Sequence, residues 1–594
     1  MRLLFSLEEI NLLIGIPQLL KRLLVLYGLN IPCFNRVSRK NFWDASFSLK
    51  IKRHYEIIKK KRGYVMQPFD IIIKDARIID GTGSPEFHGD IGISGDRIGL
   101  IGAIPDEMGR RVIKAEGMVA SPGFVDIHSH SDYYLLIDRR GESKIRQGVT
   151  TEIGGNCGYA AAPICGEEFE ERKRTYNDLY GLKTDWKDLD DYFERLGAGG
   201  LPFNFGLLIG HNTIRESIMG ARADNPSESE MGRMLEMVSS GMEDGAFGIS
   251  TGLIYPPACF SGEEEIIRLC QLVSDMGGIF TIHMRSEGDL LIEAVEEAIR
   301  ISSKSGIPLQ ISHLKTAGKD NWAKIDKVFS IIEEARKRGI DVTADRYPYT
   351  ASNALLNAIL PNWVLEGGRT TGISRLKDLE LRKKIEEELS KKRDLSSFDR
   401  IIISQVFKNS NKPYEGLSVL RASKRAEKDI YTFLFDLLTE EEMMVEGIFF
   451  SMDEENLKRI LSMPYVMVAS DSASIGIDGP LSKGRPHPRG FGTFPRVISR
   501  YVREERVLDL ETAIKKMTYD PCRKFGIRDR GIIKIGSYAD IVLFDPERIK
   551  DLASYDDPKQ FSEGIAYVVL NGEITLEEGK ITSWKAGRVL KRGA

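Results

Sequence analysis

Residues 121–136 read SPGFVDIHSHSDYYLL, an apolar run that ends in two histidines separated by one residue. On an extended strand, residues i and i+2 point to the same face. We therefore expect His128 and His130 to present two imidazole nitrogens to one point at the end of a buried strand. The chain has only eight histidines. This pair is either part of a metal site or two polar residues on a partly buried strand. Residues elsewhere in the chain distinguish these two interpretations.

The same apolar run is the first of a series in which strand-like stretches alternate with helix-like ones. It is followed along the chain by TTEIGGNC, NFGLLIGHN, AFGISTGLIY, GIFTIHMR, PLQISHLK, DVTADRYPY and YVMVASDS. Eight buried-type strands with helical-period segments between them are typical of a (β/α)8 barrel. The sequence therefore predicts an α/β fold whose TIM-like barrel occupies residues 121–529.

One connection in this series is far longer than an ordinary crossover. It runs from Tyr349 to Val466 and contains charged helical stretches such as LKDLELRKKIEEELSKK. Crossovers between parallel strands usually need only a few tens of residues. We predict a helical insertion at about residues 355–463, between strands 7 and 8, that covers the mouth of the barrel as a lid.

Both ends of the predicted barrel are flanked by short strands separated by turns. Residues 66–120 look like a small antiparallel unit, and residues 530–594 have the same texture. We expect the two segments to form one small β-sandwich domain. Residues 1–65 do not match it, and their basic part would suit a membrane-surface or nucleic-acid arm. Our preferred interpretation is an extension outside the functional fold, with Met66 as the true initiator.

Composition narrows the class of protein. Hydrophobic residues make up 42% of the chain and the net charge is -3, so nothing indicates a nucleic-acid partner. No run is long and apolar enough to cross a membrane. The six cysteines include no C-x-x-C pair, which favours free thiols in a reducing compartment and predicts a cytoplasmic protein. The oligomeric state cannot be derived from these features.

Active sites of barrels lie at the carboxyl ends of the strands. Each residue found there has an ordinary alternative: a cysteine is often a small buried hydrophobe, and an aspartate can cap a helix. Together they predict a metal centre, and imidazole plus thiolate is a zinc-type ligand set. The predicted ligands are His128, His130, Cys157, His283, His313 and Asp471.

The ligand set predicts a hydrolytic mechanism. Zinc lowers the pKa of bound water toward ~7, and a nearby carboxylate moves the proton to the leaving group. We assign that role to Asp471, and expect Asp126 and Asp345 to orient loops or ligands.

Five further polar residues are candidates for substrate binding at the barrel mouth. Their alternatives are surface charges, packed aromatic rings and loop support. They are Lys315, Tyr347, Arg285, Arg489 and His211.

The motifs together resemble a known family. GFVDIHSHSD, GNCG, HMRSEG, ISHLK, YPYTAS, ASDS, HPRGFGTFPRV and GSYADIVLFDP, in this order, resemble the metal-dependent amidohydrolase superfamily and, more narrowly, the N-acyl-D-amino-acid deacylases (D-aminoacylases). The resemblance runs from about residue 67 to the C-terminus. It implies hydrolysis of an N-acyl-D-amino acid to a carboxylate and a free D-amino acid, with Asp471 as general acid/base.

The resemblance also implies how the metal is held. A tightly bound zinc is expected on Cys157, His283 and His313. A second, weaker position is expected near His128, His130, Cys157 and Asp471.

Two departures from the family pattern affect substrate detail, since Ala160 and Ala258 stand where serine and glycine are usual. The acyl group, the amino-acid side chain, the preference for D over L and the number of working metals stay open. The alternatives are a D-specific dipeptidase or a cyclic amidase of the hydantoinase or dihydroorotase type on the same scaffold. A third is a non-catalytic protein with this fold.

Overall fold

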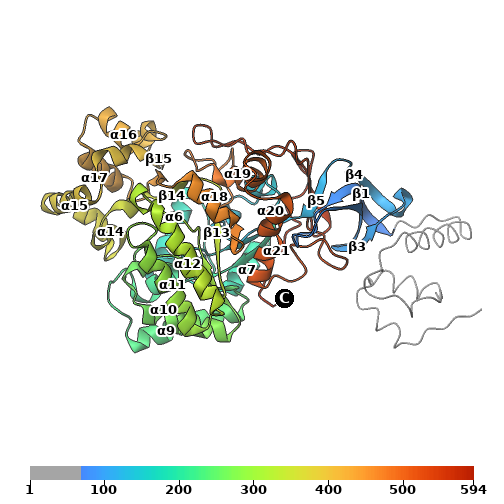
Figure 1. Cartoon of the computed structure of the whole chain (residues 1–594). Helices are drawn as coiled ribbons and strands as arrows, with labels where there is room; N and C mark the ends of the chain where they lie inside the picture. The colour runs from blue at the N-terminus through green and yellow to red at the C-terminus, as the bar shows by residue number, and fades with distance from the viewer. Residues whose placement is uncertain (1–67, 594) are drawn as a thin grey trace, which may run out of the picture.

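The computed structural model describes residues 68–593. The predicted N-terminal extension and the predicted initiator Met66 lie outside the described residues. In this part of the chain, no helix is long and apolar enough to span a bilayer. Figure 1 shows three regions along the molecule: a β-rich region at one end, a central region of alternating strands and helices, and a mostly helical body at the other end.

The central region contains two parallel sheets. The first has the order β6 (Phe124–Asp126), β7 (Val149–Gly154), β8 (Asn204–Leu207). The second has the order β17 (Val466–Val468), β13 (Val342–Arg346), β12 (Leu309–Ile311), β11 (Ile279–His283), β10 (Gly248–Gly252), β9 (Ile209–Gly210). Only Leu208 separates β8 from β9, and an isolated parallel bridge joins Ser129, just after β6, to Ser472, just after β17. Each edge of one sheet therefore adjoins an edge of the other.

These parallel strands are buried because helices cover their outer faces. Every residue of β7, β8, β10 and β11 is buried, as parallel strands with continuous apolar runs require. The helices that follow successive strands lie side by side in Figure 1; they are α9 (Glu228–Glu243), α10 (Glu263–Asp275), α11 (Leu291–Ser305) and α12 (Ile325–Lys337). A capping box starts α9, since Ser227 and Glu230 satisfy each other's backbone N–H groups.

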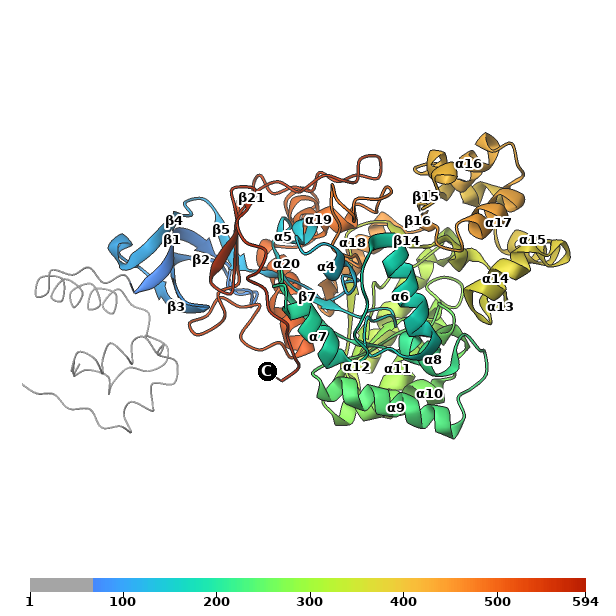
Figure 2. The ribbon, with the colours of Figure 1, turned by 180° about the vertical axis from the view of Figure 1, so that it is seen from behind.

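The segment between β13 and β17, residues 347–465, has its own sheet and its own core. The antiparallel sheet has the order β14 (Ala351–Leu355), β16 (Glu446–Phe450), β15 (Ile401–Gln405). Its buried residues, among them Phe398 and Leu434, form a hydrophobic cluster separate from that of the central region. This intervening segment is the yellow to orange body in Figure 1, and helix α6 (Gly166–Tyr180) lies next to its strand β14 in both views (Figures 1 and 2).

Strands from both ends of the chain share one nine-stranded sheet. Strand β5 (Val119–Pro122) pairs antiparallel with β18 (Ile541–Phe544), which joins the N-terminal strands to the C-terminal ones. The expectation of a purely antiparallel N-terminal unit is wrong, because β1 (Phe69–Ile78) runs parallel to both β4 (Gly109–Lys114) and β5. The chain leaves the outer strand β3 (Arg97–Gly102) and crosses to the other side of β1, so no hairpin can form there.

Candidate metal centre

The predicted ligands stand at the carboxyl ends of five parallel strands. His128 follows β6, Cys157 follows β7, His283 ends β11, His313 follows β12 and Asp471 follows β17. One ligand atom each of His128, Cys157, His313 and Asp471 lies within 4.8 Å of all the others, and all four residues are buried. Residues separated by more than 300 positions in the sequence therefore meet because parallel strands end at the same edge.

The first group consists of Cys157, His283 and His313. The His313 Nε2 atom lies 2.9 Å from His283 Nδ1 and 3.6 Å from the Cys157 sulfur. Burial raises the pKa of the Cys157 thiol, but the charge of His128 and hydrogen bonds from His128, His130 and His283 outweigh it and hold the pKa well below its usual range. These contacts favour the thiolate, which is the metal-binding form.

The second group shares Cys157 with the first. His128 Nε2 lies 3.3 Å from the Cys157 sulfur and 3.4 Å from Asp471 Oδ1. His130 Nε2 lies 3.1 Å from the same Asp471 oxygen. Burial lowers the pKa of His130, but hydrogen bonds to Asp471 and Cys157 outweigh it and raise the pKa to about 9.

Three residues of the centre have left-handed backbone conformations that non-glycine residues rarely adopt. The φ angles of Cys157, His313 and Asp471 are 54°, 36° and 51°. Such conformations cost about 1–3 kcal/mol each and persist where the surrounding structure imposes them, often at functional sites. The glycine after the cysteine in GNCG is required too, since a Cβ on Gly158 would lie 1.8 Å from the Asn212 side-chain oxygen.

Two buried carboxylates orient the histidines. Asp345 Oδ1 lies 3.1 Å from His128 Nδ1 and accepts a hydrogen bond from the His313 backbone N–H at 2.8 Å. Glu287 Oε1 lies 2.9 Å from His313 Nδ1 and also accepts from the Lys315 ammonium. We therefore place the proton of His313 on Nδ1, which leaves the Nε2 lone pair directed at Cys157 and His283.

Sequence reasoning did not select Glu287, although it had assigned an orienting role to Asp345. The available signal was the spacing in HMRSEG, where Glu287 follows His283 by four residues in the loop after a strand.

The donor set fits a bound cation. Nitrogen and sulfur lone pairs of His283, His313 and Cys157 converge, and a cation would satisfy them together. The carboxylates of Asp345 and Glu287 contact the Nδ1 atoms of His128 and His313, as carboxylates commonly do with metal-binding histidines. His283 Nε2 is buried without a hydrogen-bond partner among the described residues, and Glu287 Oε2 lies 3.7 Å from it.

Three of the five predicted substrate-binding residues lie beside the centre. Arg489 Nη1 donates to Asp471 Oδ2 at 2.7 Å, and its guanidinium lies 4.6 Å from the centre of the Tyr347 ring. The Tyr347 hydroxyl is buried without a partner in residues 68–593. Lys315 contacts Glu287 and lies 2.8 Å from His313 Nδ1.

The structure does not bring Arg285 and His211 to the centre. The Arg285 guanidinium is bound by Glu297, at 2.9 Å, and by the backbone oxygens of Cys259 and Ser261. Both ring nitrogens of His211 are occupied, by Thr251 and Glu265 at 2.8 Å each. Their strand-end positions were read correctly, but a sequence does not show which neighbour a long side chain will meet.

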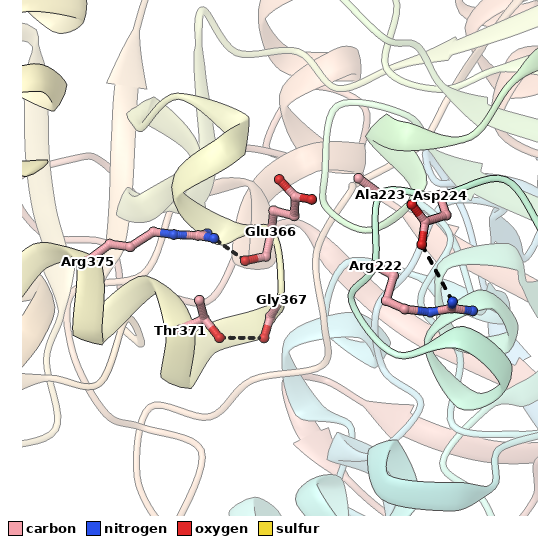
Figure 3. A pocket seen from close by; sticks show the side chains of 7 residues that line it. All are labelled: Arg222, Ala223, Asp224, Glu366, Gly367, Thr371 and Arg375. Carbon is pink, nitrogen blue, oxygen red and sulfur yellow. Dashed lines mark hydrogen bonds and ion pairs between the residues drawn. The ribbon is translucent and has the colours of Figure 1, made fainter.

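A hollow of about 270 Å³ lies elsewhere, between the loop at residues 222–224 and the intervening segment (Figure 3). Arg375 donates to the Glu366 backbone oxygen on one side of it, and Arg222 pairs with Asp224 on the other. None of the predicted ligands lines this hollow, so it is separate from the candidate metal centre.

Comparisons with known proteins agree with this arrangement. The model of the amidohydrolase family matches residues 111–391 and 453–576. A D-aminoacylase from Alcaligenes xylosoxydans xylosoxydans is 34% identical over 529 residues, which cover 89% of this chain and 99% of that protein.

Solved structures give the same family. An N-acyl-D-glutamate deacylase from Bordetella bronchiseptica, complexed with zinc and a phosphonate mimic of the tetrahedral intermediate, has a TM-score of 0.75 at 31% identity; the match covers 88% of this chain and 99% of that one. A D-aminoacylase studied for its binuclear metal centre has a TM-score of 0.73 at 33% identity, covering 88% and 100%. The chain therefore belongs to the amidohydrolase family and, within it, to the D-aminoacylase group of N-acyl-D-amino-acid deacylases.

Proposed function

We propose that this chain hydrolyses the amide bond of N-acyl-D-amino acids, releasing a carboxylate and a free D-amino acid. The observation that carries the proposal is the Asp471 carboxylate, which lies within 3.4 Å of the ring nitrogens of both His128 and His130. Those residues share Cys157 with a second histidine pair. The similarity to a D-aminoacylase over 89% of the chain supports the substrate class.

Metal dependence is expected from the donor set and from the zinc in the related deacylase. Cys157, His283 and His313 would hold one zinc tightly, and His128, His130, Cys157 and Asp471 would form a weaker second position. When bound, the ion supplies a Lewis acid that acidifies water and polarises the scissile carbonyl.

The chain's own residues move the proton. Burial raises the pKa of Asp471, but the charges of Arg489, His313 and His128 outweigh burial and hold it well below its usual range. The carboxylate is thus ionised at neutral pH and can take a proton from the attacking water at one oxygen. It would then deliver that proton to the amide nitrogen as the C–N bond breaks. Lys315, Tyr347 and Arg489 offer cationic and hydroxyl donors for the substrate carboxylate.

The proposal includes the architecture that presents the site. The parallel strands from β6 to β17, with β8 and β9 counted as one interrupted strand, are interpreted as the eight strands of one (β/α)8 barrel, which the adjoining sheet edges support. The nine-stranded sheet is interpreted as the β domain formed by both chain ends, and residues 347–465 as a lid inserted between strands 7 and 8.

The direct test is amine release from paired N-acetyl-D- and N-acetyl-L-amino acids by zinc-loaded protein. We expect release from D substrates only. Absence of release from every pair, with zinc still bound, would contradict the proposal. The same protein would then be tested on D-configured dipeptides and on cyclic amides.

The shared cysteine gives a prediction on metal content. Cys157→Ser is expected to weaken metal binding by more than the 10- to 100-fold that follows loss of a supporting carboxylate alone, because Cys157 contacts both histidine groups. Metal analysis after dialysis against a weak chelator measures the loss. Cys165→Ser, at a cysteine outside the candidate centre whose backbone N–H donates to Ser217 Oγ, is the matched control, and the variant should keep its metal. Equal metal in both variants would contradict the ligand assignment.

A further inference from the structure

The antiparallel sheet β14-β16-β15 of the proposed lid, here called the lid sheet, carries the acidic residue Glu446 on the face opposite the core of the intervening segment. On the central strand β16, Phe449 and the preceding Val445 pack into the core of the intervening segment. Side chains alternate along a strand, so Glu446, Ile448 and Phe450 face the other way. Phe450 contacts the Tyr555 ring at 4.7 Å between centroids, and Tyr555 contacts His487 at 5.2 Å. The Glu446 face is therefore directed toward the mouth of the proposed barrel.

Strand β14 is hydrogen-bonded both to the segment that carries Arg489 and to Glu446. His487 Nε2 donates to the Ala351 backbone oxygen of β14 at 2.9 Å, and its Nδ1 accepts from the Arg489 backbone N–H at 3.0 Å. Two residues further along β14, Asn353 Nδ2 donates to Glu446 Oε2 at 3.3 Å. The lid carboxylate is thus held on the strand beside the arginine that binds Asp471.

Asn353 and Gln405 flank Glu446 on the two neighbouring strands, and two tyrosines lie on the helices α4 (Tyr134–Ile137) and α6. The rings of Tyr134 and Tyr180 lie 6.4 Å apart, on the short helix α4 and at the end of α6. Lys483 lies 4.6 Å from the Tyr180 ring, and the adjacent Gly484 packs against Gln405, which pairs with Glu446 across the sheet. Burial and the Glu446 charge raise the pKa of Tyr180 to about 12. Figures 1 and 2 show α6 beside β14.

The carboxylate has no cation in direct contact among the described residues, although the charge of Arg489 acts on it and opposes the rise in its pKa that burial causes. Within residues 68–593, Glu446 makes no ion pair, and its one side-chain hydrogen bond comes from the neutral amide of Asn353. Its side chain is half-buried, so it is recessed and still reachable from solvent. A recessed carboxylate between two amide residues, whose charge also acts on Tyr134 and Tyr180, has the chemistry that binds ammonium or guanidinium groups.

We propose that Glu446, together with Tyr134, Tyr180, Asn353 and Gln405, forms the side-chain subsite and selects N-acyl-D-amino acids with basic side chains, such as D-lysine and D-arginine. The inference rests on the proposed deacylase function and specifies its substrate class. The cationic end of the side chain would bind Glu446, while the α-carboxylate stays with Arg489 and Lys315. An acidic side chain, as in the substrate named for the Bordetella relative, would meet a like charge and be rejected.

The test compares kcat/KM for Nα-acetyl derivatives of D-lysine, D-norleucine and D-glutamate. We expect D-lysine to exceed D-norleucine by about 10- to 100-fold, as a hydrogen bond to a charged group warrants, and D-glutamate to be the slowest. In Glu446→Gln, the rate for D-lysine should fall by about 10- to 100-fold, mainly through KM, while D-norleucine changes less than about twofold. The D-norleucine rate also shows that the variant is folded.

Two further variants sharpen the comparison. Glu446→Lys should reverse the order of D-lysine and D-glutamate, and Glu440→Gln, an exposed glutamate of the same segment, should leave all three rates unchanged. Hydrolysis of D-norleucine at the same rate as D-lysine, or an unaltered ratio in Glu446→Gln, would overturn this inference alone. Hydrolysis of no D substrate would overturn the proposed function and this inference with it.

Discussion

Asp471→Asn is expected to lower kcat for N-acetyl-D-amino acids by about 10²- to 10⁴-fold, the range that loss of a positioned general acid/base produces. The amide keeps the shape of the side chain but cannot take the proton from water. Arg489 and both histidines of the HxH pair contact this carboxylate directly, whereas Asp345 and Glu287 contact the Nδ1 atoms of His128 and His313. Steady-state kinetics with a D substrate measures the loss.

The metal content separates a lost proton carrier from a lost ligand. Asp471→Asn should keep the metal held by Cys157, His283 and His313, because Asp471 belongs to the other group. Asp478→Asn is a suitable control, since that aspartate is exposed and pairs with Arg140 at 2.5 Å; its kcat should be unchanged. A kcat for Asp471→Asn within threefold of the wild type would refute the assignment.

The candidate ligands could be predicted from the sequence because their positions follow from strand periodicity. A histidine or cysteine at the end of a buried parallel run must lie at one edge of the sheet, whatever the helices between the strands do. The orienting residues could not be predicted in this way. Glu287 lies in a loop, and its contact with His313 depends on the fold of both loops.

The same reason explains the two substrate candidates that lie elsewhere. Arg285 follows the end of β11 by two residues and Lys315 follows the end of β12 by four, yet the long side chain of Arg285 turns to Glu297 on helix α11. His211 begins helix α8 (His211–Met219) and meets Glu265 of α10. Backbone position follows from local pattern, whereas side-chain direction is decided by charges that are distant in sequence.

The burial of one lysine is the clearest example of a feature that could not be predicted from the sequence. Lys144 lies in the short helix α5 (Glu142–Ile145), in a stretch that looks like exposed surface, yet its side chain is 0% exposed. Its Nζ atom donates to Asp126 at 2.7 Å, to Ser470 at 2.9 Å and to the Ser472 backbone oxygen at 2.9 Å, and pairs with Glu152 at 2.6 Å. It therefore ties β6 and β7 to the segment that carries Asp471.

Lys144→Met is expected to destabilise the protein by about 3–5 kcal/mol, because breaking a buried ion pair leaves uncompensated charges in the core. Here two carboxylates, Asp126 and Glu152, lose their cation together. The thermal midpoint of the zinc-loaded protein measures the loss, and Lys337→Met, at an exposed lysine of α12, is the control and should change it little.

The pH dependence identifies the cause of that loss. Burial already raises the pKa of Glu152, and Lys144 opposes this rise, so removing the lysine should raise the folded-state pKa of Glu152 further. A carboxyl group whose pKa is raised on folding binds more protons in the folded state than in the unfolded state. Its cost to the free energy of unfolding is therefore complete above the folded-state pKa, and it decreases as the pH falls toward the unfolded-state pKa of ~4. The stability deficit of Lys144→Met should therefore shrink under acidic conditions.

Adding Glu152→Gln to Lys144→Met should restore part of the lost stability at neutral pH, because it removes one of the two carboxylate charges left without a cation. A deficit that is independent of pH, and unaffected by Glu152→Gln, would mean that lost packing rather than unpaired charge sets the cost.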